Sequence, residues 1–210
     1  MNVGAPDGLG EMVTGLPGQR APVSRGGAEF ESLVAEFRRM QAALCAAAPD
    51  PELVAALEQE FRDAADRLDA IRQPVEEDRA SRRVGLSSRG HPGLVPFEVE
   101  HLDDRVFRAT VEFTDAHLGG NGAVHGGAIP LLFDDFLGIF VGEKGQSHSR
   151  TASLTVNFRK ITPINTPLLV EGTIDRIDGR KTWVSGRLFH GSDLTADAEA
   201  LFLRLLPGQP

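Results

Sequence analysis

The sequence predicts an α+β fold in which an antiparallel sheet wraps around one apolar helix, preceded by a helical hairpin. Between residues 30 and 71, apolar residues recur at helical spacing in two separate runs. After Pro96 the pattern changes to the alternation of a half-buried strand. One apolar helical segment then precedes four strand-like segments that no further helix separates, which favours antiparallel pairing over a parallel βαβ arrangement.

The hairpin is predicted over residues 27–74. Its second helix begins with Asp50 as N-cap and Pro51 at the first helical position, and Pro74 closes it. The connection between the helices is short, so they should run antiparallel. Two amphipathic stripes bury each other only partly, and we therefore expect the hairpin to dock on the main domain or on another subunit. The stripes consist of Phe30, Leu33, Val34, Phe37, Met40 and Leu44, then Leu53, Leu57, Phe61, Ala64, Leu68 and Ile71.

The segments on either side of the hairpin are poor in bulky side chains. Residues 1–26 are rich in Gly and Pro, and they offer too little apolar surface to offset the entropy of ordering them. We expect a disordered tail there, and it lacks the basic start and apolar core of a secretion signal. Residues 75–94 carry several Arg, Gly and Ser and are predicted to form a linker.

The main domain is predicted over residues 95–206. A strand carries Phe107 to Phe113, a Gly-rich turn follows, and an apolar helix runs from Ala128 to about Val141. Such a unit leaves an edge strand and one side of the helix uncovered, and dimerisation is the usual remedy. The later strands are predicted at residues 151–160, 168–177, 182–190 and 194–205.

Composition narrows the possible partners. The formal net charge of -8 argues against binding to a phosphate backbone, so nucleic acid is not an expected partner. Cys45 is the only cysteine, which excludes an intrachain disulfide and makes a reducing cytoplasm the default compartment. No apolar run is long enough to cross a bilayer, and the scattered histidines lack the spacing of metal ligands.

The most informative stretch is the Gly-rich turn from Gly119 to Gly127. Glycines directly before a helix leave its first amide N–H groups unpaired, and an anion or a developing oxyanion can bind to such donors. Pro130 supports a helix start at this point because proline is tolerated in the first turn. On this helix Asp134 points away from the apolar side, whereas its neighbour Asp135 lies at the margin of that side.

These residues resemble the PaaI-like acyl-CoA thioesterases of the hotdog superfamily, close to their four-member thioesterase branch. The resemblance rests on the run from His125 to Ile129, on Asp134 nine positions after the histidine, and on residues 151–163, which end in Thr-Pro. It covers about residues 95–206 and implies a hotdog fold, in which the sheet wraps around the central helix. The N-terminal hairpin lies outside it.

The resemblance also implies roles for individual residues. Asp134 would act as nucleophile or as general base on water, and the Gly126 N–H would bind the oxyanion, with help from the Gly127 N–H. His125 would orient the carbonyl or the water. Ser153 would hold the attacking water beside Asp134.

Five further residues are weaker candidates. Asn121 offers an amide before the histidine, where the family often has an asparagine. Four basic residues at strand ends or in a turn could contact the phosphates of coenzyme A, and solvated surface charge is the equal alternative. They are Arg159, Lys160, Arg180 and Lys181.

The favoured function is hydrolysis of acyl-CoA to free acid and coenzyme A by a homodimer or homotetramer, with Asp134 of one subunit facing Gly126 and His125 of another. No cofactor is expected beyond the coenzyme A of the substrate. One alternative is a non-catalytic acyl-CoA-binding or interaction protein that recruits partners through the hairpin. A hotdog hydratase is weaker because its differently spaced Asp and His pair is not found. The sequence contains neither the GxSxG motif of serine hydrolases nor the phosphate-binding loop of P-loop enzymes, so neither class is expected.

Overall fold

The computed structural model describes residues 29–72, 90–144 and 149–206. The predicted tail and most of the predicted linker, residues 75–89, lie outside these ranges. None of the described helices is long and apolar enough to span a membrane.

The hairpin consists of α1 (Glu29–Ala46) and α2 (Pro51–Asp69), as predicted. The Asp50 side chain accepts a hydrogen bond from the Leu53 N–H at 2.8 Å, so the predicted N-cap is confirmed. Helix α2 ends before Pro74, which lies outside the described residues.

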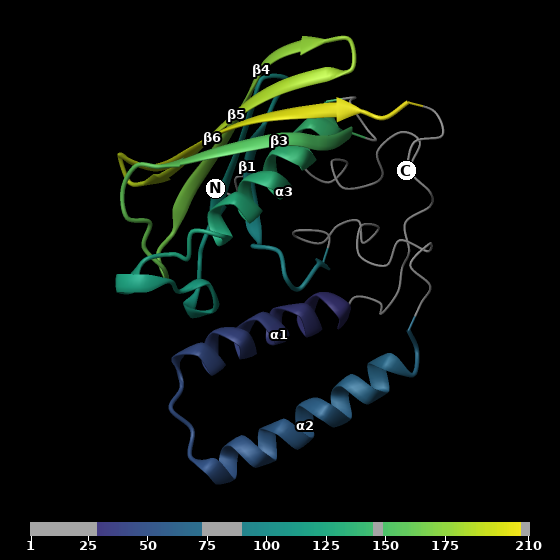
Figure 1. Ribbon diagram of the computed structural model, residues 1–210, viewed down its shortest axis with the longest axis vertical. Coiled ribbons are helices and arrows are strands. Elements are labelled where there is room, and N and C mark those ends of the chain that lie inside the picture. The colour runs from purple at the N-terminus through teal and green to yellow at the C-terminus, as the bar shows by residue number, and fades with distance from the viewer. Residues whose placement is uncertain (1–28, 73–89, 145–148, 207–210) are drawn as a thin grey trace, which may run out of the picture.

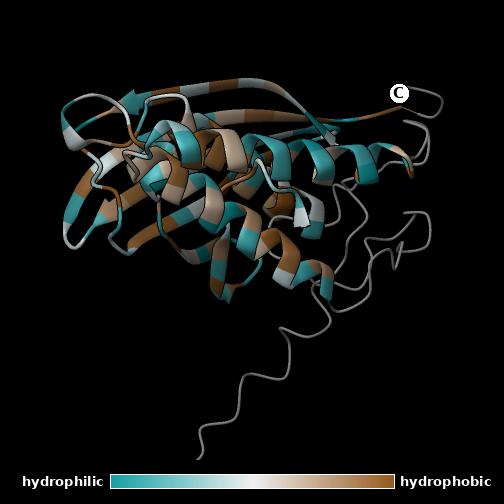
Figure 2. Cartoon of the chain, turned by 90° about the horizontal axis from the view of Figure 1, so that it is seen from below, coloured by the Kyte–Doolittle hydropathy of each residue, from teal (hydrophilic) through white to brown (hydrophobic). Residues whose placement is uncertain are grey.

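Only α1 of the two hairpin helices packs against the sheet domain. It lies between α2 and that domain and contacts the short 3-10 helix η3 (Asp115–His117) (Figure 1). Among the described residues of α1 and α2, Val34 alone is buried. Viewed from the hairpin side, both helices show apolar residues among hydrophilic ones (Figure 2). The predicted docking on the main domain is therefore confirmed for α1, and α2 keeps its apolar stripe largely exposed.

Six strands of the described ranges form one antiparallel sheet in the order β1-β2-β4-β5-β6-β3. All five pairings between neighbouring strands are antiparallel, which confirms the predicted α+β class. The strands are β1 (Phe97–Leu102), β2 (Val106–Val111), β3 (Ser149–Phe158), β4 (Leu168–Asp178), β5 (Lys181–His190) and β6 (Asp193–Arg204).

The sequence analysis missed strand β1. Its six residues show almost no alternation of burial, because Phe97 alone is buried and most of the others are exposed. The strand lies at one edge of the sheet and pairs with β2 across an irregularity between Val99 and His101. Its apolar alternation covers only Phe97 to Glu100 and stops at the irregularity, which is too short a pattern to identify the strand.

The central helix α3 (Ala128–Glu143) lies against one face of the sheet and supplies much of the core (Figure 1). Two glycines of the sheet allow its close approach. A Cβ added at Gly186 would lie 2.7 Å from the ring of Phe133, and one added at Gly172 would lie 3.0 Å from Leu137. The core therefore closes around α3 as the sequence predicts, with stacked Phe107 and Phe136 rings 4.3 Å apart.

The side of α3 next to β3 is not fully covered. Strand β3 forms the second edge of the sheet, and most of its residues are exposed or half-buried. On the adjacent strip of α3, Leu131 and Asp134 are exposed. The predicted open edge and open helix side thus occur together, between α3 and β3.

Candidate active site at the start of helix α3

Helix α3 begins without a side-chain cap. Its N-cap residue is Gly127, which has no side chain to accept a hydrogen bond from the first turn. Within the described ranges, no acceptor contacts the N–H of the preceding residue, Gly126. That N–H is exposed at the positive end of the helix dipole, where negative charge is stabilised.

The turn that leads into α3 is held at several points. Leu118 and Val124 form a β-bridge, and the Val124 N–H donates to the carbonyl of buried Thr162 at 2.9 Å. Gly119 approaches His125 so closely that an added Cβ would lie 2.8 Å from the His125 Cα. The backbone of the Thr162-Pro163 segment after β3 is therefore an anchor for the histidine turn.

His125 is fixed by its backbone and by its ring. The His125 N–H donates to the His117 carbonyl at 2.7 Å, and the ring Nδ1 accepts from the Gly127 N–H at 3.0 Å. An accepting Nδ1 places the proton of the neutral ring on Nε2, which is then a second donor near the helix start. Because the Gly127 N–H is engaged by His125, Gly126 is the open donor of the two glycines.

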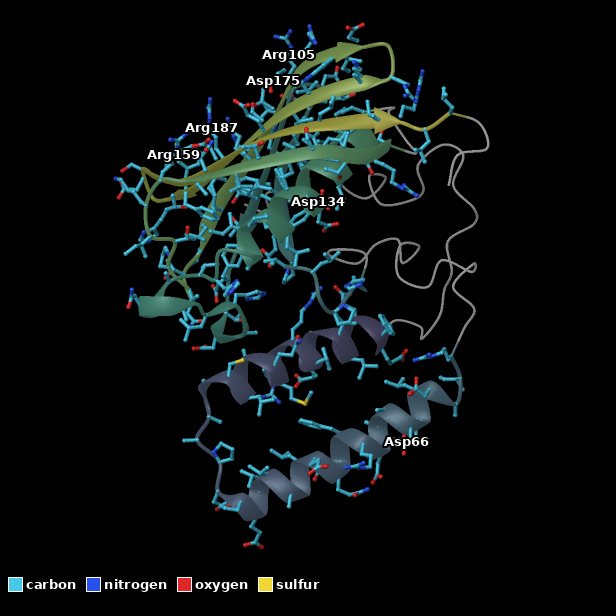
Figure 3. All side chains as sticks on the ribbon, viewed as in Figure 1. Asp66, Arg105, Asp134, Arg159, Asp175 and Arg187 are labelled. Carbon is cyan, nitrogen blue, oxygen red and sulfur yellow. The ribbon has the colours of Figure 1, made fainter. Side chains whose placement is uncertain are left out.

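The two adjacent aspartates of α3 differ in burial. Asp134 is exposed, whereas Asp135 is 7% exposed and faces the core. The Thr151 hydroxyl of β3 donates to Asp134 Oδ1 at 2.7 Å, and no cation of the described ranges pairs with this carboxylate. Asp134 is therefore the aspartate that a reactant can reach (Figure 3).

The hydroxyl beside Asp134 belongs to Thr151, a residue that the sequence analysis did not select. It had selected Ser153, two positions later, which is exposed and has no hydrogen bond to Asp134 among the described contacts. The pairing of β3 with β6 shifts register between Thr151 and Ser153. A bulge of this kind changes which residue faces the helix, and the sequence alternation does not reveal it.

Asn121 has a local structural role. It has a positive φ of 58° in the short helix η4 (Gly120–Gly122), a conformation that asparagine tolerates better than most residues. It is exposed. This conformation is one reason for an asparagine here, and a role in catalysis stays a prediction.

The four basic candidates do not gather in one place. Arg159 forms a two-point contact with Asp197, which raises the pKa of Arg159 and lowers that of Asp197, and Lys160 pairs with Asp193. Arg180 and Lys181 lie at the β4–β5 turn, at the other end of the sheet. From the Asp193 end of β6 to the end beside Lys181 is about 33 Å at about 3.3 Å per residue. One coenzyme A phosphate cannot contact all four.

Exposed apolar side chains lie near the open amide. The Phe158 ring would be 3.7 Å from a Cβ added at Gly126 and is 58% exposed, and Ile161, three residues on, is also exposed. Leu131 is exposed one turn into α3. The helix start thus combines a hydrogen-bond donor with apolar surface, which suits a carbonyl attached to an acyl chain.

Residues 121–196 match the family model of the thioesterase superfamily. This match spans the histidine turn, the central helix and the strands up to the start of β6. This part of the chain is therefore similar to the thioesterase superfamily. The central helix wrapped by an antiparallel sheet fits that assignment, and the predicted resemblance is confirmed at the level of the superfamily.

Curated relatives of the domain are named acyl-coenzyme A thioesterase THEM4. The mouse protein is 32% identical over 119 residues, which are 54% of this chain and 51% of the mouse protein. The bovine protein is 30% identical over 138 residues, which are 63% of this chain and 56% of its own length. The chain thus spans about half the length of the curated relatives it matches.

Two solved structures show the same fold. A thioesterase superfamily protein superposes with a TM-score of 0.70 at 24% identity, over 91% of this chain and 98% of that one. A Streptococcus mutans protein crystallised with acetyl CoA superposes with a TM-score of 0.50 at 21% identity, over 52% of this chain and 88% of that one. The first similarity extends well beyond the superfamily match, so it includes helices that precede the hotdog domain.

Proposed function

We propose that this protein hydrolyses acyl-CoA thioesters. The observations that carry the proposal are the open Gly126 amide just before the start of α3 and the exposed Asp134 carboxylate on the same helix. The superfamily match, the names of the curated relatives and the neighbour that binds acetyl CoA support an acyl-CoA substrate.

A single chain holds these two groups too far apart for one carbonyl. With a rise of about 1.5 Å per residue, Asp134 lies about 9 Å along the helix axis from Ala128, and Gly126 lies beyond that start. The carbon and oxygen of a carbonyl are only about 1.2 Å apart. The oxyanion donor and the carboxylate that serve one thioester must therefore come from two copies of the chain.

The strip itself is suited to such a pairing. Gly127, Leu131, Asp134 and Gly138 follow one another at helical spacing along the side of α3 that β3 leaves open. A two-fold axis through the middle of this strip would place Asp134 of one copy opposite the helix start of the other. It would also bury Leu131 and bring the copies close at Gly138. We infer a homodimer as the active unit, and a tetramer would contain two such units.

The chemistry follows from the groups that meet across this axis. The Asp134 carboxylate, oriented by the Thr151 hydroxyl, takes a proton from a water molecule while the water oxygen attacks the thioester carbon. The carbonyl oxygen becomes an oxyanion at the Gly126 N–H, beside the Nε2–H of His125. Collapse of this intermediate expels the coenzyme A thiolate, and the proton held by Asp134 can neutralise it. Direct attack by Asp134 would form an anhydride with the acyl group first.

A thiol-release assay tests this function. The purified chain is incubated with acyl-CoA thioesters from acetyl to palmitoyl, and free thiol and free acid are quantified together. We expect equal amounts of both products and a preference among chain lengths. Saturable binding of the same thioesters with no thiol release would favour the non-catalytic acyl-CoA-binding alternative and contradict the enzymatic one.

A further inference from the structure

Helix α1 contacts the domain through one face. Val34 is buried at 6% exposure, and Arg38 follows one helical turn later on the same face. The Arg38 guanidinium donates to the His91 carbonyl at 2.8 Å. Because His91 lies just before β1, this bond ties the hairpin to the polypeptide that enters the sheet.

Helix α1, which carries Arg38, contacts the short helix η3, which contains His117. Burial lowers the pKa of His117, and the nearby positive charge of Arg38 lowers it further. The His117 ring accepts from the Thr114 N–H at 3.0 Å and meets the Phe113 ring edge to face at 5.5 Å. The histidine is therefore held between α1 and the loop that follows β2.

His117 is connected directly to the candidate active site. Its carbonyl accepts the His125 N–H at 2.7 Å, and the His125 ring in turn accepts the Gly127 N–H. Displacement of His117 would therefore move the two donors, His125 and Gly126, that face the substrate carbonyl in the proposed reaction.

The hydrogen bonding of Arg38 indicates more than simple packing. Its Nε is buried and has no hydrogen-bond partner among the described residues. Leaving a buried donor unsatisfied costs free energy, and an apolar side chain would fill the same space without that cost. The guanidinium is thus accounted for by its hydrogen bond to the His91 carbonyl, which supports the contact of α1 with η3.

We propose that α1 is a working part of the active site and that Arg38 is a positioning residue, which holds the His117–Gly127 turn in the geometry needed for hydrolysis. The catalytic consequence rests on the proposed function, whereas the structural contact does not. The helical hairpin, which lies outside the matched superfamily region, would then set the turnover of the domain that follows it.

The test compares Arg38→Ala, Arg38→Lys and Arg39→Ala. Arg39 is the matched control, because it is adjacent on α1 and exposed and pairs only with Glu36 of the same helix among the described contacts. We expect kcat of Arg38→Ala to fall about tenfold or more, with KM within about twofold of wild type. A mutation at a distance that misplaces active-site groups has an effect of this size. Arg38→Lys should recover part of the loss. Equal kcat for the Arg38→Ala and Arg39→Ala proteins, both folded by circular dichroism, would overturn the proposal.

Two further readouts do not depend on turnover. Amide hydrogen exchange over residues 114–128 should speed up in Arg38→Ala and stay at wild-type rates in Arg39→Ala. The NMR titration of His117 should move to higher pH in Arg38→Ala, because a cause of its lowered pKa is gone. If the wild type releases no thiol but Arg38→Ala still shows both changes, only the thioesterase function is contradicted and the positioning role stands. Unchanged exchange and titration would reject the positioning role, whatever the activity.

Discussion

Helices α2 and α3 begin in opposite ways. At the start of α2, the Asp50 side chain accepts the Leu53 N–H, and the helix satisfies its own first donors. At the start of α3, the N-cap is a glycine without a side chain to cap the first turn, and no acceptor in the described ranges binds the Gly126 N–H. The first arrangement stabilises a helix, whereas the second leaves its donors available to a ligand.

The same contrast separates two aspartates. Asp197 on β6 is held by Arg159 and by Asn157, and its charge is neutralised within the sheet. Among the described residues, Asp134 on α3 accepts a hydrogen bond from the neutral hydroxyl of Thr151 and has no cationic partner. Asp197 is thus neutralised by its neighbours, whereas Asp134 keeps its charge available to a reactant.

The largest effect should come from removing the free carboxylate. Asp134→Asn should lower kcat roughly 10²- to 10⁴-fold, because an amide cannot take a proton from water, while the Thr151 hydroxyl can still bond to its oxygen. The assay is thiol release at saturating acyl-CoA. Asp66→Asn, at an exposed aspartate of α2, is the control and should match wild type (Figure 3). Turnover of Asp134→Asn within a few fold of wild type would remove the catalytic distinction between the two aspartates.

A smaller but still large effect is expected from shifting the start of α3. A Cβ at Gly119 would meet the backbone of His125, and this backbone must move for Gly119→Ala to fold. We expect kcat to fall about 10- to 100-fold, since small displacements of active-site groups have effects of that size.

Gly120→Ala provides the control one residue later, because nothing lies within 4 Å of a Cβ built there. The two variants differ by one position in the same turn, so both should fold, and Gly119→Ala alone should lose turnover at a temperature where both are folded. Equal turnover would show that the geometry of the histidine turn does not matter for the reaction.

Removing the cap of α2 should affect stability and leave catalysis unchanged. Asp50→Ala leaves the Leu53 N–H without its acceptor and should destabilise the helix by about 1 kcal/mol. We expect the Asp50→Ala protein to show faster amide hydrogen exchange in the first turn of α2 and the kcat of wild type. A loss of kcat would mean that the capped helix start also serves the active site.

The smallest effect concerns Arg159. Because Arg159 lowers the pKa of folded Asp197, their contact stabilises the fold above the ordinary aspartate pKa of about 3.9 and is lost as the pH falls through the lowered value. Urea denaturation should therefore show Arg159→Gln to be less stable than wild type at pH 7, with the difference vanishing in strong acid. The KM for acyl-CoA should stay within about twofold, as for an exposed ion pair. A several-fold rise in KM would instead assign Arg159 to the coenzyme A phosphates.

Much of this architecture could be predicted from the sequence, because it follows from local patterns. The caps and stripes of the hairpin, the start of α3 at the glycine turn and the outward direction of Asp134 are all set within a few residues of chain. Strand β1 was not found in this way, since its apolar alternation stops after four residues, at a break in the pairing with β2.

Contacts between distant segments also escaped the sequence analysis. The choice of Thr151 over Ser153 depends on the β3–β6 register, and the pairing of Arg159 with Asp197 depends on which strands become neighbours. The contact of Arg38 with His91 joins residues 53 positions apart. Tertiary register, which no local spacing encodes, decides each of these.

Mixing two inactive variants tests the central claim most directly. Asp134→Asn lacks the carboxylate, and Gly119→Ala displaces the helix start. If each active site joins these two features from different copies, a mixed dimer contains one intact site. Co-refolding equal amounts of the two proteins should then restore about a quarter of wild-type turnover, because half of the dimers are mixed and each carries one of two sites. Mixed dimers that form, as seen by native mass spectrometry, and yet stay inactive would contradict a site shared between copies.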